Sequence, residues 1–486
     1  MPRIWRSLLL LAAAAVAVPT LWAAESAEAT LKYFRSDLGV AARAGPLPDN
    51  LEPPGALRWR VPAEPGQSTP ILSGGKLFFT TYRKEARELA TVAWDAPTGK
   101  LLWKAVAPVT RIEPAHPTGG PAAATPACDG RRVYVFFGSY GLLCYDLDGR
   151  KLWEHPLGPF QDEFGASSSP VLVGDKVMLN QDHDRDSYLI AIDGATGQTV
   201  WKVGRPDAVR SYATPAVWTR NGRQELLVAG ALELAGYDPA DGQKLWWAQG
   251  LARIVIPVPV PSSDLIYAAS WTPGGDSGRR ITLGPWPTAL AKWDRNRDAK
   301  LARAEIDDAE VLDRFYRMDI DQSGDLEQEE WNRYAAVFQR AQNAVLAVKP
   351  ASGRGELGEN AVVWKYSRGL PYVATPLVDR GLLWMVKDGG IVTKLDAGSG
   401  RVLQDERLPG LGNYYASPVT GDGKVYFASE LGVVSVLANQ PEWRVLSSHD
   451  FKERICATPV IDHDRIYFRT ERALYCFRGQ IEPAAR

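Results

Sequence analysis

Short apolar runs separated by turn residues recur along the chain between residues 56 and 478. The segments AWDAPTGKLLW at 93–103 and AIDGATGQTVW at 191–201 both read Ala-x-Asp-x-x-Thr-Gly-x-x-x-Trp, and looser copies occupy 144–153, 236–246 and 394–403. In each copy an apolar run ends at Asp, a Gly-containing turn reverses the chain, and an alternating strand follows, which predicts a β-hairpin. Because one hairpin cannot bury its own apolar face, repeats of this length stack on their neighbours.

A Pro-containing inner strand marks the start of each repeat and sets the number of repeats. The successive spacings between these prolines are 56, 44, 45, 42, 119, 42 and 41 residues. A four-stranded propeller blade takes about 40–50 residues. The sequence therefore predicts an all-β fold, an eight-bladed β-propeller of four-stranded antiparallel blades with one large insertion. The prolines are Pro70, Pro126, Pro170, Pro215, Pro257, Pro376, Pro418 and Pro459.

The last repeat indicates how the ring closes. After Pro459 the sequence offers strands at 464–469 and 473–478, and no Trp-bearing fourth strand follows. The segment ALRWRV, which precedes the first repeat, has the matching Leu-x-Trp ending at Trp59. We therefore expect a strand at 56–62 to complete the eighth blade of a propeller spanning 56–480, because closure removes an unpaired strand edge. A solenoid is the alternative architecture, but it would not need this N-terminal strand.

Residues 1–24 have the pattern of a secretory signal peptide. Arg3 and Arg6 precede an apolar run from Leu8 to Val18, and small residues follow it. Because the run is short for a membrane span, we expect an exported protein, periplasmic or extracellular, with no transmembrane span in the mature chain. A retained N-terminal anchor is the alternative. Residues 25–55, rich in Ala and Pro, predict a loosely ordered lead-in.

Charge and cysteine content bear on the expected partners and on disulfide bonds. The formal net charge of −1 gives no reason to expect nucleic acid as a partner, and we expect a monomer. Cys128 and Cys144, and likewise Cys456 and Cys476, would fall on the first and third strands of one blade. Such strands lie roughly 9.6 Å apart, beyond the ~7 Å that a disulfide can bridge. Buried free thiols are therefore expected.

The longest interval between repeats carries the strongest chemical pattern. Trp246 and Trp364 are 118 residues apart, where about 45 are expected from the other repeats. Within this interval, DRNRDAKLARAE at 294–305 and DIDQSGDLEQEE at 319–330 place acidic, amide or hydroxyl groups at loop positions 1, 3 and 5 and Glu at position 12. Oxygen ligands in this pattern wrap a Ca²⁺ ion in EF-hands. The sequence predicts a small α-helical EF-hand pair at 285–342, inserted in blade 5.

The two predicted loops differ at the sharp turn. The second has Gly324 there, whereas the first has Ala299, whose Cβ disfavours the turn conformation. We therefore expect the second loop to bind Ca²⁺ more tightly, with its final Glu as the most important ligand; a metal-free insert is the alternative. The predicted ligands of the first loop are Asp294, Asn296, Asp298, the Lys300 carbonyl and Glu305. Those of the second loop are Asp319, Asp321, Ser323, the Asp325 carbonyl and Glu330.

Apolar residues at helical spacing flank the loops and predict packed helices. Only 13 residues separate the two loops, so one helix is expected to leave the first loop and enter the second. The Gly-rich stretch at 272–278 predicts a hinge. The two apolar faces consist of Ile306, Val311, Leu312, Phe315 and Tyr316, and of Trp331, Tyr334, Ala335 and Phe338.

The Ala-x-Asp-x-x-Thr-Gly-x-x-x-Trp units resemble the pyrroloquinoline-quinone-like repeat, the tryptophan-docking unit of eight-bladed propellers. The resemblance covers roughly 56–480 apart from the insert, and the whole chain resembles bacterial exported members of that group. It implies either a scaffold without cofactor, as in the outer-membrane β-barrel assembly machinery, or a PQQ-dependent quinoprotein dehydrogenase. This chain has no adjacent cysteines and no Cys-x-x-Cys-His. We therefore expect a non-catalytic binding or scaffold protein without PQQ, and keep the oxidoreductase as the alternative.

Candidate binding residues gather where loops lead into the predicted inner strands, around the central channel. His183 between two Asp residues can ligate a metal, act as a base or lie in a solvated loop, and the tyrosines can pack the channel or recognise a ligand. No Gly-x-Ser-x-Gly, His-Glu-x-x-His or phosphate-loop motif is present. An unidentified protein or small-molecule ligand is expected at this face. The candidates are Arg210, Tyr212, Tyr372, Tyr414, Tyr415, Arg454, His116, Asn180, Gln181, Asp182, His183 and Asp184.

Overall fold

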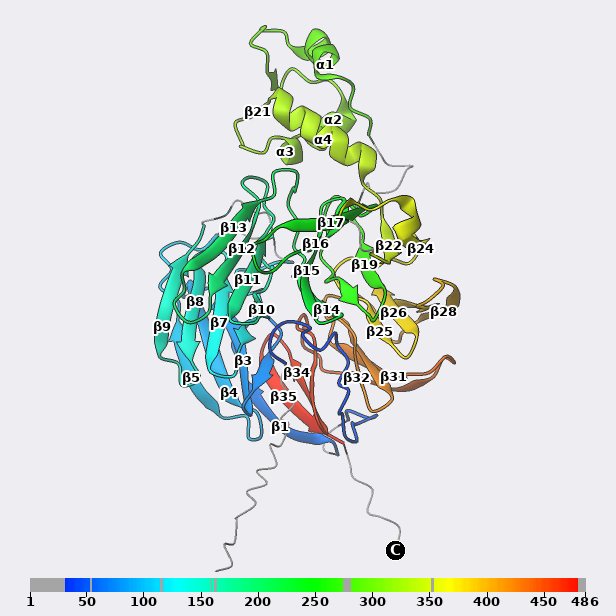
Figure 1. Ribbon diagram of the computed structural model, residues 1–486. Coiled ribbons are helices and arrows are strands. Elements are labelled where there is room, and N and C mark those ends of the chain that lie inside the picture. The colour runs from blue at the N-terminus through cyan, green and yellow to red at the C-terminus, as the bar shows by residue number, and fades with distance from the viewer. Residues whose placement is uncertain are drawn as a thin grey trace, which may run out of the picture.

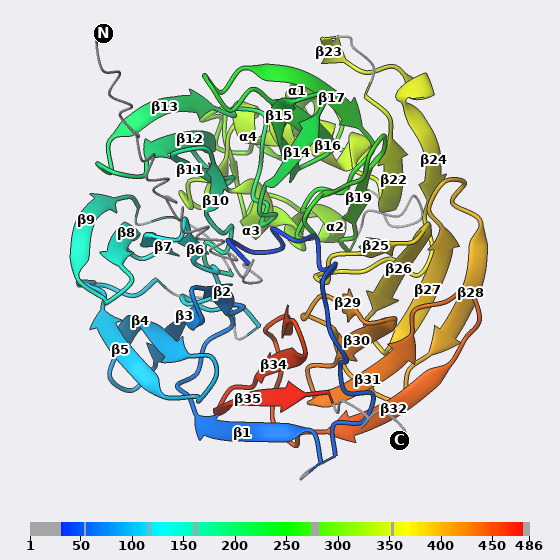
Figure 2. The same cartoon turned by 60° about the horizontal axis from the view of Figure 1, so that its bottom comes forward.

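The computed structural model describes residues 31–52, 55–113, 116, 118–158, 160, 164–273, 281–350 and 354–479. The predicted signal peptide and most of the predicted hinge lie outside these residues. Eight antiparallel sheets stand around a central axis, which confirms the predicted eight-bladed β-propeller (Figures 1 and 2).

The first four blades follow chain order from the innermost to the outermost strand. Blade 4 carries an additional short strand, β23 (Gly355–Glu356), which pairs parallel with β17. Blade 1 consists of β2 (Ile71–Ser73), β3 (Lys76–Arg83), β4 (Glu88–Asp95) and β5 (Leu101–Val106), and blade 2 of β6 (Ala127–Cys128), β7 (Arg132–Phe137), β8 (Gly141–Asp146) and β9 (Lys151–Pro156). Blade 3 consists of β10 (Val171–Val173), β11 (Lys176–Gln181), β12 (Tyr188–Asp193) and β13 (Thr199–Gly204), and blade 4 of β14 (Ala216–Arg220), β15 (Arg223–Gly230), β16 (Glu233–Tyr237) and β17 (Lys244–Gln249).

The remaining blades complete the ring, and blade 5 carries the insert between its second and third strands. Blade 5 consists of β18 (Val260–Pro261), β19 (Ile266–Ser270), β22 (Ala344–Val348) and β24 (Val362–Tyr366), and blade 6 of β25 (Leu377–Asp379), β26 (Leu382–Lys387), β27 (Ile391–Asp396) and β28 (Val402–Arg407). Blade 7 consists of β29 (Val419–Gly421), β30 (Lys424–Ala428), β31 (Val433–Ala438) and β32 (Val445–Asp450), and blade 8 of β33 (Val460–Asp462), β34 (Arg465–Arg469), β35 (Ala473–Arg478) and β1 (Leu57–Pro62).

Blade 8 joins the two ends of the described chain. Strand β1 pairs antiparallel with β35, placing Trp59 opposite Cys476. Figure 2 shows β1, in blue, as the outer neighbour of β35, in red. The eighth blade therefore has four strands only because the N-terminal strand supplies the last of them.

A proline immediately precedes the innermost strand of every blade. In blade 5 this residue is Pro259, directly before β18, and not Pro257 as predicted from sequence. The segment Ile-Pro-Val-Pro at 256–259 offers two such prolines, and the spacing of neighbouring repeats is too variable to choose between them. The hydrogen bond from Val258 N–H to the next blade identifies the equivalent position.

Tryptophan docking joins five of the eight pairs of neighbouring blades. In each, the indole N–H of an outer strand donates to a carbonyl in the turn before the outer strand of the next blade, at 2.9–3.2 Å. A Cβ added to the glycine of that turn would lie 2.6–2.8 Å from the indole ring, so the close approach requires glycine. The pairs are Trp59 with Gly99, Trp103 with Gly149, Trp153 with Gly197, Trp201 with Gly242 and Trp364 with Gly400.

A lysine takes the place of the docking tryptophan between blades 6 and 7. Strand β28 has no tryptophan, and Lys394 of β27 donates instead to the carbonyls of Gln440 and Glu442, at 2.9 and 3.3 Å. Its ammonium lies over the Trp384 ring, 4.5 Å from the centroid. Burial lowers the pKa of Lys394 from its ordinary value.

A ring of hydroxyl groups links the blades close to the central axis. The backbone N–H of the residue before the inner-strand proline donates to the hydroxyl of the equivalent Ser or Thr in the next blade, at 2.9–3.1 Å. These hydrogen bonds span seven of the eight junctions; Val258 of blade 5 has no hydroxyl to offer blade 4. The hydroxyls belong to Thr69, Thr125, Ser169, Thr214, Thr375, Ser417 and Thr458.

The lead-in is ordered where the structure describes it, so the expectation of a loose segment is wrong for residues 31–52. Leu47 and Leu51 are buried in the core of blades 7 and 8. The Arg35 guanidinium donates to the carbonyls of Pro376 and Pro418, both at 3.2 Å, and burial lowers its pKa to about 10. In Figure 2 the lead-in crosses the near side of the ring, with the helices of the insert behind it. Composition did not reveal the few apolar residues that anchor this segment.

The insert is a small helical unit with its own apolar core, projecting from blade 5 (Figure 1). At its stem, Thr272 and Asn343 exchange two hydrogen bonds, of 2.9 and 3.0 Å. Val337 and Ala341 pack against loop residues of blades 3 and 4. Its elements are α1 (Trp286–Trp293), β20 (Leu301–Ala302), α2 (Ala309–Leu312), α3 (Phe315–Met318), β21 (Asp325–Leu326) and α4 (Gln328–Arg340).

The expectation of one helix between the two loops is wrong. Two short helices, α2 and α3, replace it, with a break at Asp313 and Arg314. The Asp308 carboxylate caps α2 by accepting from the N–H groups of Glu310 and Val311. Tyr316, predicted on the apolar face, is 50% exposed.

All four cysteines are free thiols, and three of them, Cys128, Cys144 and Cys476, are buried. Cys456 is only partly buried. Across the described ranges, none of the helices has both the length and the apolar character needed to cross a lipid bilayer.

Replacement of Ser417 by Ala tests the hydroxyl ring. The substitution removes the acceptor of the buried Thr375 N–H, and it should lower the free energy of unfolding by about 1–3 kcal/mol. Ser448→Ala, at an exposed position on β32 of the same blade, should change it by less than about 0.5 kcal/mol. Denaturant unfolding of both variants measures the difference, and equal stabilities would contradict a structural role for the ring.

Candidate calcium loops and channel cavity

The two predicted loops lie side by side in the insert. Strands β20 and β21, one from each loop, pair antiparallel with Leu301 opposite Leu326. Both leucines are fully buried in the core of the insert. These leucines are the eighth residues of the two predicted loops, so the pairing places equivalent loop positions opposite each other.

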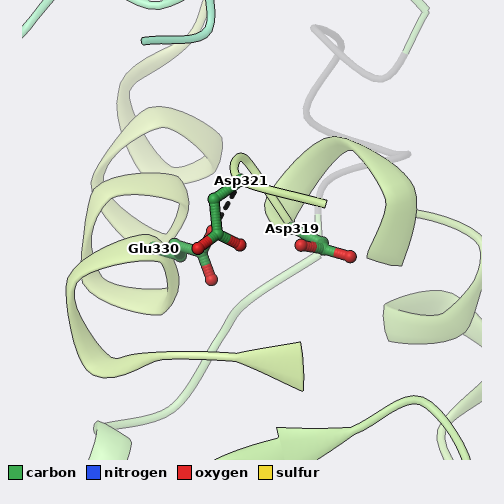
Figure 3. Close-up of side chains that lie close together, drawn as sticks. All are labelled: Asp319, Asp321 and Glu330. Carbon is green, nitrogen blue, oxygen red and sulfur yellow. Dashed lines mark hydrogen bonds between the residues drawn. The ribbon is translucent and has the colours of Figure 1, made fainter. Parts of the chain in front are cut away.

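The second loop brings three carboxylates together. Asp319, Asp321 and Glu330 have carboxylate oxygens within 4.8 Å of one another. Figure 3 shows the three side chains gathered beside the loop. Within the described ranges no other three His, Cys, Asp or Glu side chains meet in this way. Glu330 closes the loop by accepting from the N–H groups of Ile320, at 2.7 Å, and Glu327, at 3.0 Å.

Desolvation of these carboxyls creates a need for positive charge. Burial raises the pKa of Glu330 and of Asp319 above their ordinary values. Hydrogen bonding to Ser323 lowers the pKa of Asp321, which is exposed. Three clustered oxygens from carboxylates, two of them partly desolvated, are a donor set that fits a hard divalent cation such as Ca²⁺.

The remaining predicted ligands of the second loop lie beside this cluster. The Ser323 hydroxyl donates to the Asp325 carbonyl at 3.0 Å, so positions 5 and 7 are in contact. Asp319 accepts from the N–H groups of Ser323 and Gly324, both at 3.0 Å. The backbone thus already encloses the cluster as an EF-hand loop would.

In the first loop the backbone wraps the predicted ligands in the same way, but their carboxylate oxygens do not come together in one cluster. Glu305 accepts from the N–H groups of Arg295 and Ala302, both at 3.0 Å, much as Glu330 does in the second loop. Asn296 Nδ2 donates to Asp298 Oδ2 at 2.9 Å, so these two predicted ligands hold each other.

Two further predicted ligands complete the first loop. Asp294 accepts from the N–H groups of Arg297, at 2.7 Å, and Ala299, at 3.1 Å. The N–H of Lys300 donates to Asp298, and the Lys300 side chain forms an ion pair with Glu327 at 2.6 Å.

The sharp turn takes the same backbone conformation in both loops, although only one has glycine. Ala299 has φ of 63° and Gly324 has φ of 91°. A left-handed conformation costs a residue with a Cβ roughly 1–2 kcal/mol. At the sharp turn the first loop therefore carries backbone strain that the second avoids, whereas at the fourth loop position Arg297 and Gln322 are both left-handed.

A cavity of about 220 Å³ occupies the central channel on the face that bears the insert. All seven hydroxyls of the ring line it, and sequence reasoning missed them. The repeated Ser/Thr-Pro pairs at the blade starts were the available indication. The other lining residues are Phe34, Gln67, Thr118, Gly119, Ala123, Phe164, Ser167, Tyr212, Ile256, Tyr372, Val373, Tyr415 and Cys456.

Three of the predicted channel tyrosines, Tyr212, Tyr372 and Tyr415, line the cavity. Tyr414 does not; it is buried between blades and donates to the Gly410 carbonyl at 2.8 Å. Arg454 forms an ion pair with Glu430 at 2.7 Å and lines a neighbouring cavity.

The predicted loop at 180–184 is a buried polar network and not a solvated loop. Asp182 forms an ion pair with Arg205 at 2.7 Å, and Asp184 with Arg210 at 3.0 Å. The His183 ring stacks on Phe160 with centroids 4.1 Å apart, and its Nε2 lies 3.0 Å from Gln181 Oε1. Asn180 is fully buried on β11. His116, farther along the channel mouth, stacks at a tilt on Phe164.

Comparison with known proteins identifies the fold but does not identify an activity. A family model described as outer membrane protein assembly factor BamB matches residues 49–201 and 90–253, less than half of the chain. BamB from Moraxella catarrhalis matches with a TM-score of 0.56 and 13% identity, covering 87% of this chain and 99% of that one. No curated protein matches this sequence.

Two further solved structures share the fold. The computationally designed Ika8 protein matches with a TM-score of 0.50 and 11% identity, over 86% of this chain and 98% of that one. Quinohemoprotein alcohol dehydrogenase from Comamonas testosteroni matches with a TM-score of 0.51 and 11% identity, over 88% of this chain and 77% of that one. Since an assembly factor, a designed protein and a dehydrogenase all match, the fold alone does not decide among their functions.

Exchange of the turn residues tests the strain in the first loop. Ala299→Gly should stabilise the insert by about 1 kcal/mol, because glycine adopts the left-handed turn without a Cβ clash. Gly324→Ala should destabilise it by about 1–2 kcal/mol, although a Cβ there would meet nothing within 4 Å. Amide exchange at Leu301 and Leu326 reports local opening of the insert. Unchanged exchange in both variants would contradict this account.

Proposed function

We propose, on the premise that this chain is an eight-bladed β-propeller of pyrroloquinoline-quinone-like repeats, that it is an exported calcium-binding protein whose propeller binds a partner or ligand without catalysis. The pattern of residues 1–24 supports export. The observation that carries the binding function is the chemistry of the channel. Its described lining contains no Asp, Glu, His, Lys or Arg.

The described lining lacks carboxylates, imidazoles and amines, which are common acid–base groups in catalysis. Acid–base and nucleophilic catalysis need a group that titrates or is activated near the substrate. At the cavity, burial raises the pKa of the Cys456 thiol to about 11 and also raises the pKa of the Tyr415 hydroxyl above its ordinary value. The hydroxyls of the ring accept backbone N–H groups and have no base beside them among the described lining residues.

The cavity is also a poor fit for the quinone cofactor of the dehydrogenases. That cofactor carries several carboxylates, and burying them without cationic partners is costly. The described lining offers no Lys or Arg to pair with them, and Phe34 of the lead-in occupies its floor. These residues therefore support a binding function in preference to a quinoprotein oxidoreductase.

Calcium binding rests on the second loop. Asp319, Asp321 and Glu330 would hold the ion, with the Ser323 hydroxyl and the Asp325 carbonyl beside them. The first loop would bind a second ion more weakly, because its turn residue is strained. Bound Ca²⁺ would neutralise the clustered carboxylates and stabilise the insert.

Exposed apolar side chains suggest where a protein partner would contact the propeller. Leu411 and Leu431 are 58% and 62% exposed, the highest values among the large apolar residues described. They lie in the connections β28–β29 and β30–β31. Connections between blades, and those from second to third strands, share one end of an antiparallel blade. The two leucines therefore lie on the face that bears the insert and the channel mouth.

Calorimetric titration with Ca²⁺ tests the proposed metal site. The wild type should release or absorb heat in two phases. Glu330→Gln should weaken the tighter phase at least about tenfold, because it removes the ligand that can bind through two oxygens. Glu305→Gln should affect only the weaker phase. Glu329→Gln is the matched control, since this neighbouring side chain is 85% exposed and lies outside the cluster. No heat in the wild type would contradict calcium binding.

Affinity capture from the native cell envelope tests the binding function. The immobilised mature chain should retain a defined partner, and Leu411→Asp with Leu431→Asp should reduce its recovery at least about fivefold by charging the exposed apolar pair. Val200→Asp is the control, because Val200 is 46% exposed on the outer strand of blade 3, away from that face. Equal recovery by all three proteins, or turnover of an alcohol with added quinone, would contradict the proposal.

A further inference from the structure

We infer that the channel cavity is a binding site for an uncharged saccharide, held by the ring of hydroxyls and covered by aromatic side chains. The inference rests on the proposed binding function and specifies the chemical class of one ligand. It follows from three properties of the cavity, namely its hydrogen-bond donors, the absence of charged side chains from its described lining, and its aromatic walls.

The first property is that the ring hydroxyls can still donate hydrogen bonds. Each of the seven ring hydroxyls already accepts a backbone N–H from the preceding blade, as Thr69 does from Thr458 at 3.1 Å. A hydroxyl that accepts one hydrogen bond still has its own proton to donate. All seven groups also line the cavity. The channel therefore presents donors from nearly every direction around its axis.

This circular arrangement favours a ligand with acceptors around its whole edge. The hydroxyl and ring oxygens of a sugar lie around the periphery of the ring. An extended peptide, in contrast, presents its carbonyls on two opposite sides only. The arrangement of Thr125, Thr214, Ser417 and the other hydroxyls around the axis therefore suits a saccharide better than an inserted peptide segment.

The second property is the absence of ionised groups from the described lining. A carboxylate or ammonium ligand would lose its hydration without gaining a partner of opposite charge in the described lining. The amide of Gln67 and the hydroxyls of Thr118 and Ser167 add neutral donors and acceptors above the ring. The cavity thus selects against sugar acids and amino sugars.

The third property is the position of the aromatic rings. Phe34 lies at the floor, because it lines both this cavity and the small cavity beneath it on the lead-in side. Phe164 and Tyr212 meet edge to face at the wall, with centroids 5.8 Å apart, and Tyr372 and Tyr415 stand on the other side. Aromatic faces pack well against the C–H faces of a sugar, whose polar groups then point to the hydroxyl ring.

The cavity is blind, which limits the length of the ligand. The lead-in closes the far end of the channel through Leu31, Phe34 and Arg35, which line the cavity beneath. At about 220 Å³, the cavity is smaller than the roughly 300–1,000 Å³ typical of drug-sized ligand sites. A monosaccharide or the terminal unit of a glycan fits this space, entering from the face of the insert.

Saturation-transfer NMR on the mature chain tests the inference with four probes. D-glucose and N-acetyl-D-glucosamine are uncharged, whereas D-glucuronate and D-glucosamine carry opposite charges at neutral pH. At least one uncharged sugar should bind, at least about tenfold more tightly than either charged sugar, because only the charged forms lose hydration without compensation. Ser167→Trp should abolish transfer by filling the half-buried wall position. Thr219→Trp, at an exposed site on β14 near the opposite face, should leave it unchanged.

Each contrary result has a distinct meaning. Absence of transfer from all four probes, with the envelope partner still captured, would overturn the saccharide site and leave the proposed binding function standing. Equal binding of charged and uncharged sugars, or transfer that survives Ser167→Trp, would also overturn it. Loss of a captured protein partner in Ser167→Trp would show that a peptide occupies the channel and would overturn the saccharide assignment.

Discussion

The hydrogen bonds between neighbouring blades around the axis are the constraint on which the rest of the propeller depends. Near the centre the innermost strands converge, and their inner edges have no further strand to pair with. Buried backbone N–H groups still need acceptors. A Ser or Thr hydroxyl from the next blade supplies one at seven junctions, as in the pair Thr125 and Ser169. A larger side chain at this radius would push the blades apart, so the same small residues that hold the ring also leave the channel open.

The period of the repeat predicted the propeller correctly because the period is set by local chemistry. Five blades have an Asp-to-Gly turn between their third and fourth strands, and a tryptophan of the preceding blade covers the glycine of each such turn. Those features are visible in sequence. The choice between Pro257 and Pro259 was not, because it depends on which backbone N–H reaches Thr375 in the following blade. The packing of the lead-in could not be predicted either, because Leu47 and Leu51 pack against residues more than 350 positions away in the sequence.

The proposed calcium loops and the channel differ in how much of their structure could be predicted from the sequence. The sequence predicted that Asp319, Asp321 and Glu330 act together, because the proposed ligands of an EF-hand loop lie within twelve residues, and the structure brings their carboxylates together. The sequence could not show that the carboxylates of the first loop converge less, which depends on contacts such as that between Asn296 and Asp298. In the channel, residues from all around the ring meet. The ion pairs of Asp182 and Asp184 arise from partners 23 and 26 residues away that only the fold brings close.

Strand β1 has a consequence for the order in which this molecule can fold. It is synthesised before every blade, yet its partner β35 is the last strand of the described chain, with Leu57 opposite Phe477. Until that partner exists, blade 8 lacks its outer strand and blade 1 lacks the indole of Trp59 over Gly99. Contacts this distant in sequence form slowly, because the entropy of closing the loop must be overcome first. Seven blades can therefore assemble first as an open arc. Pairing of β1 with β35 then completes blade 8 and closes the ring.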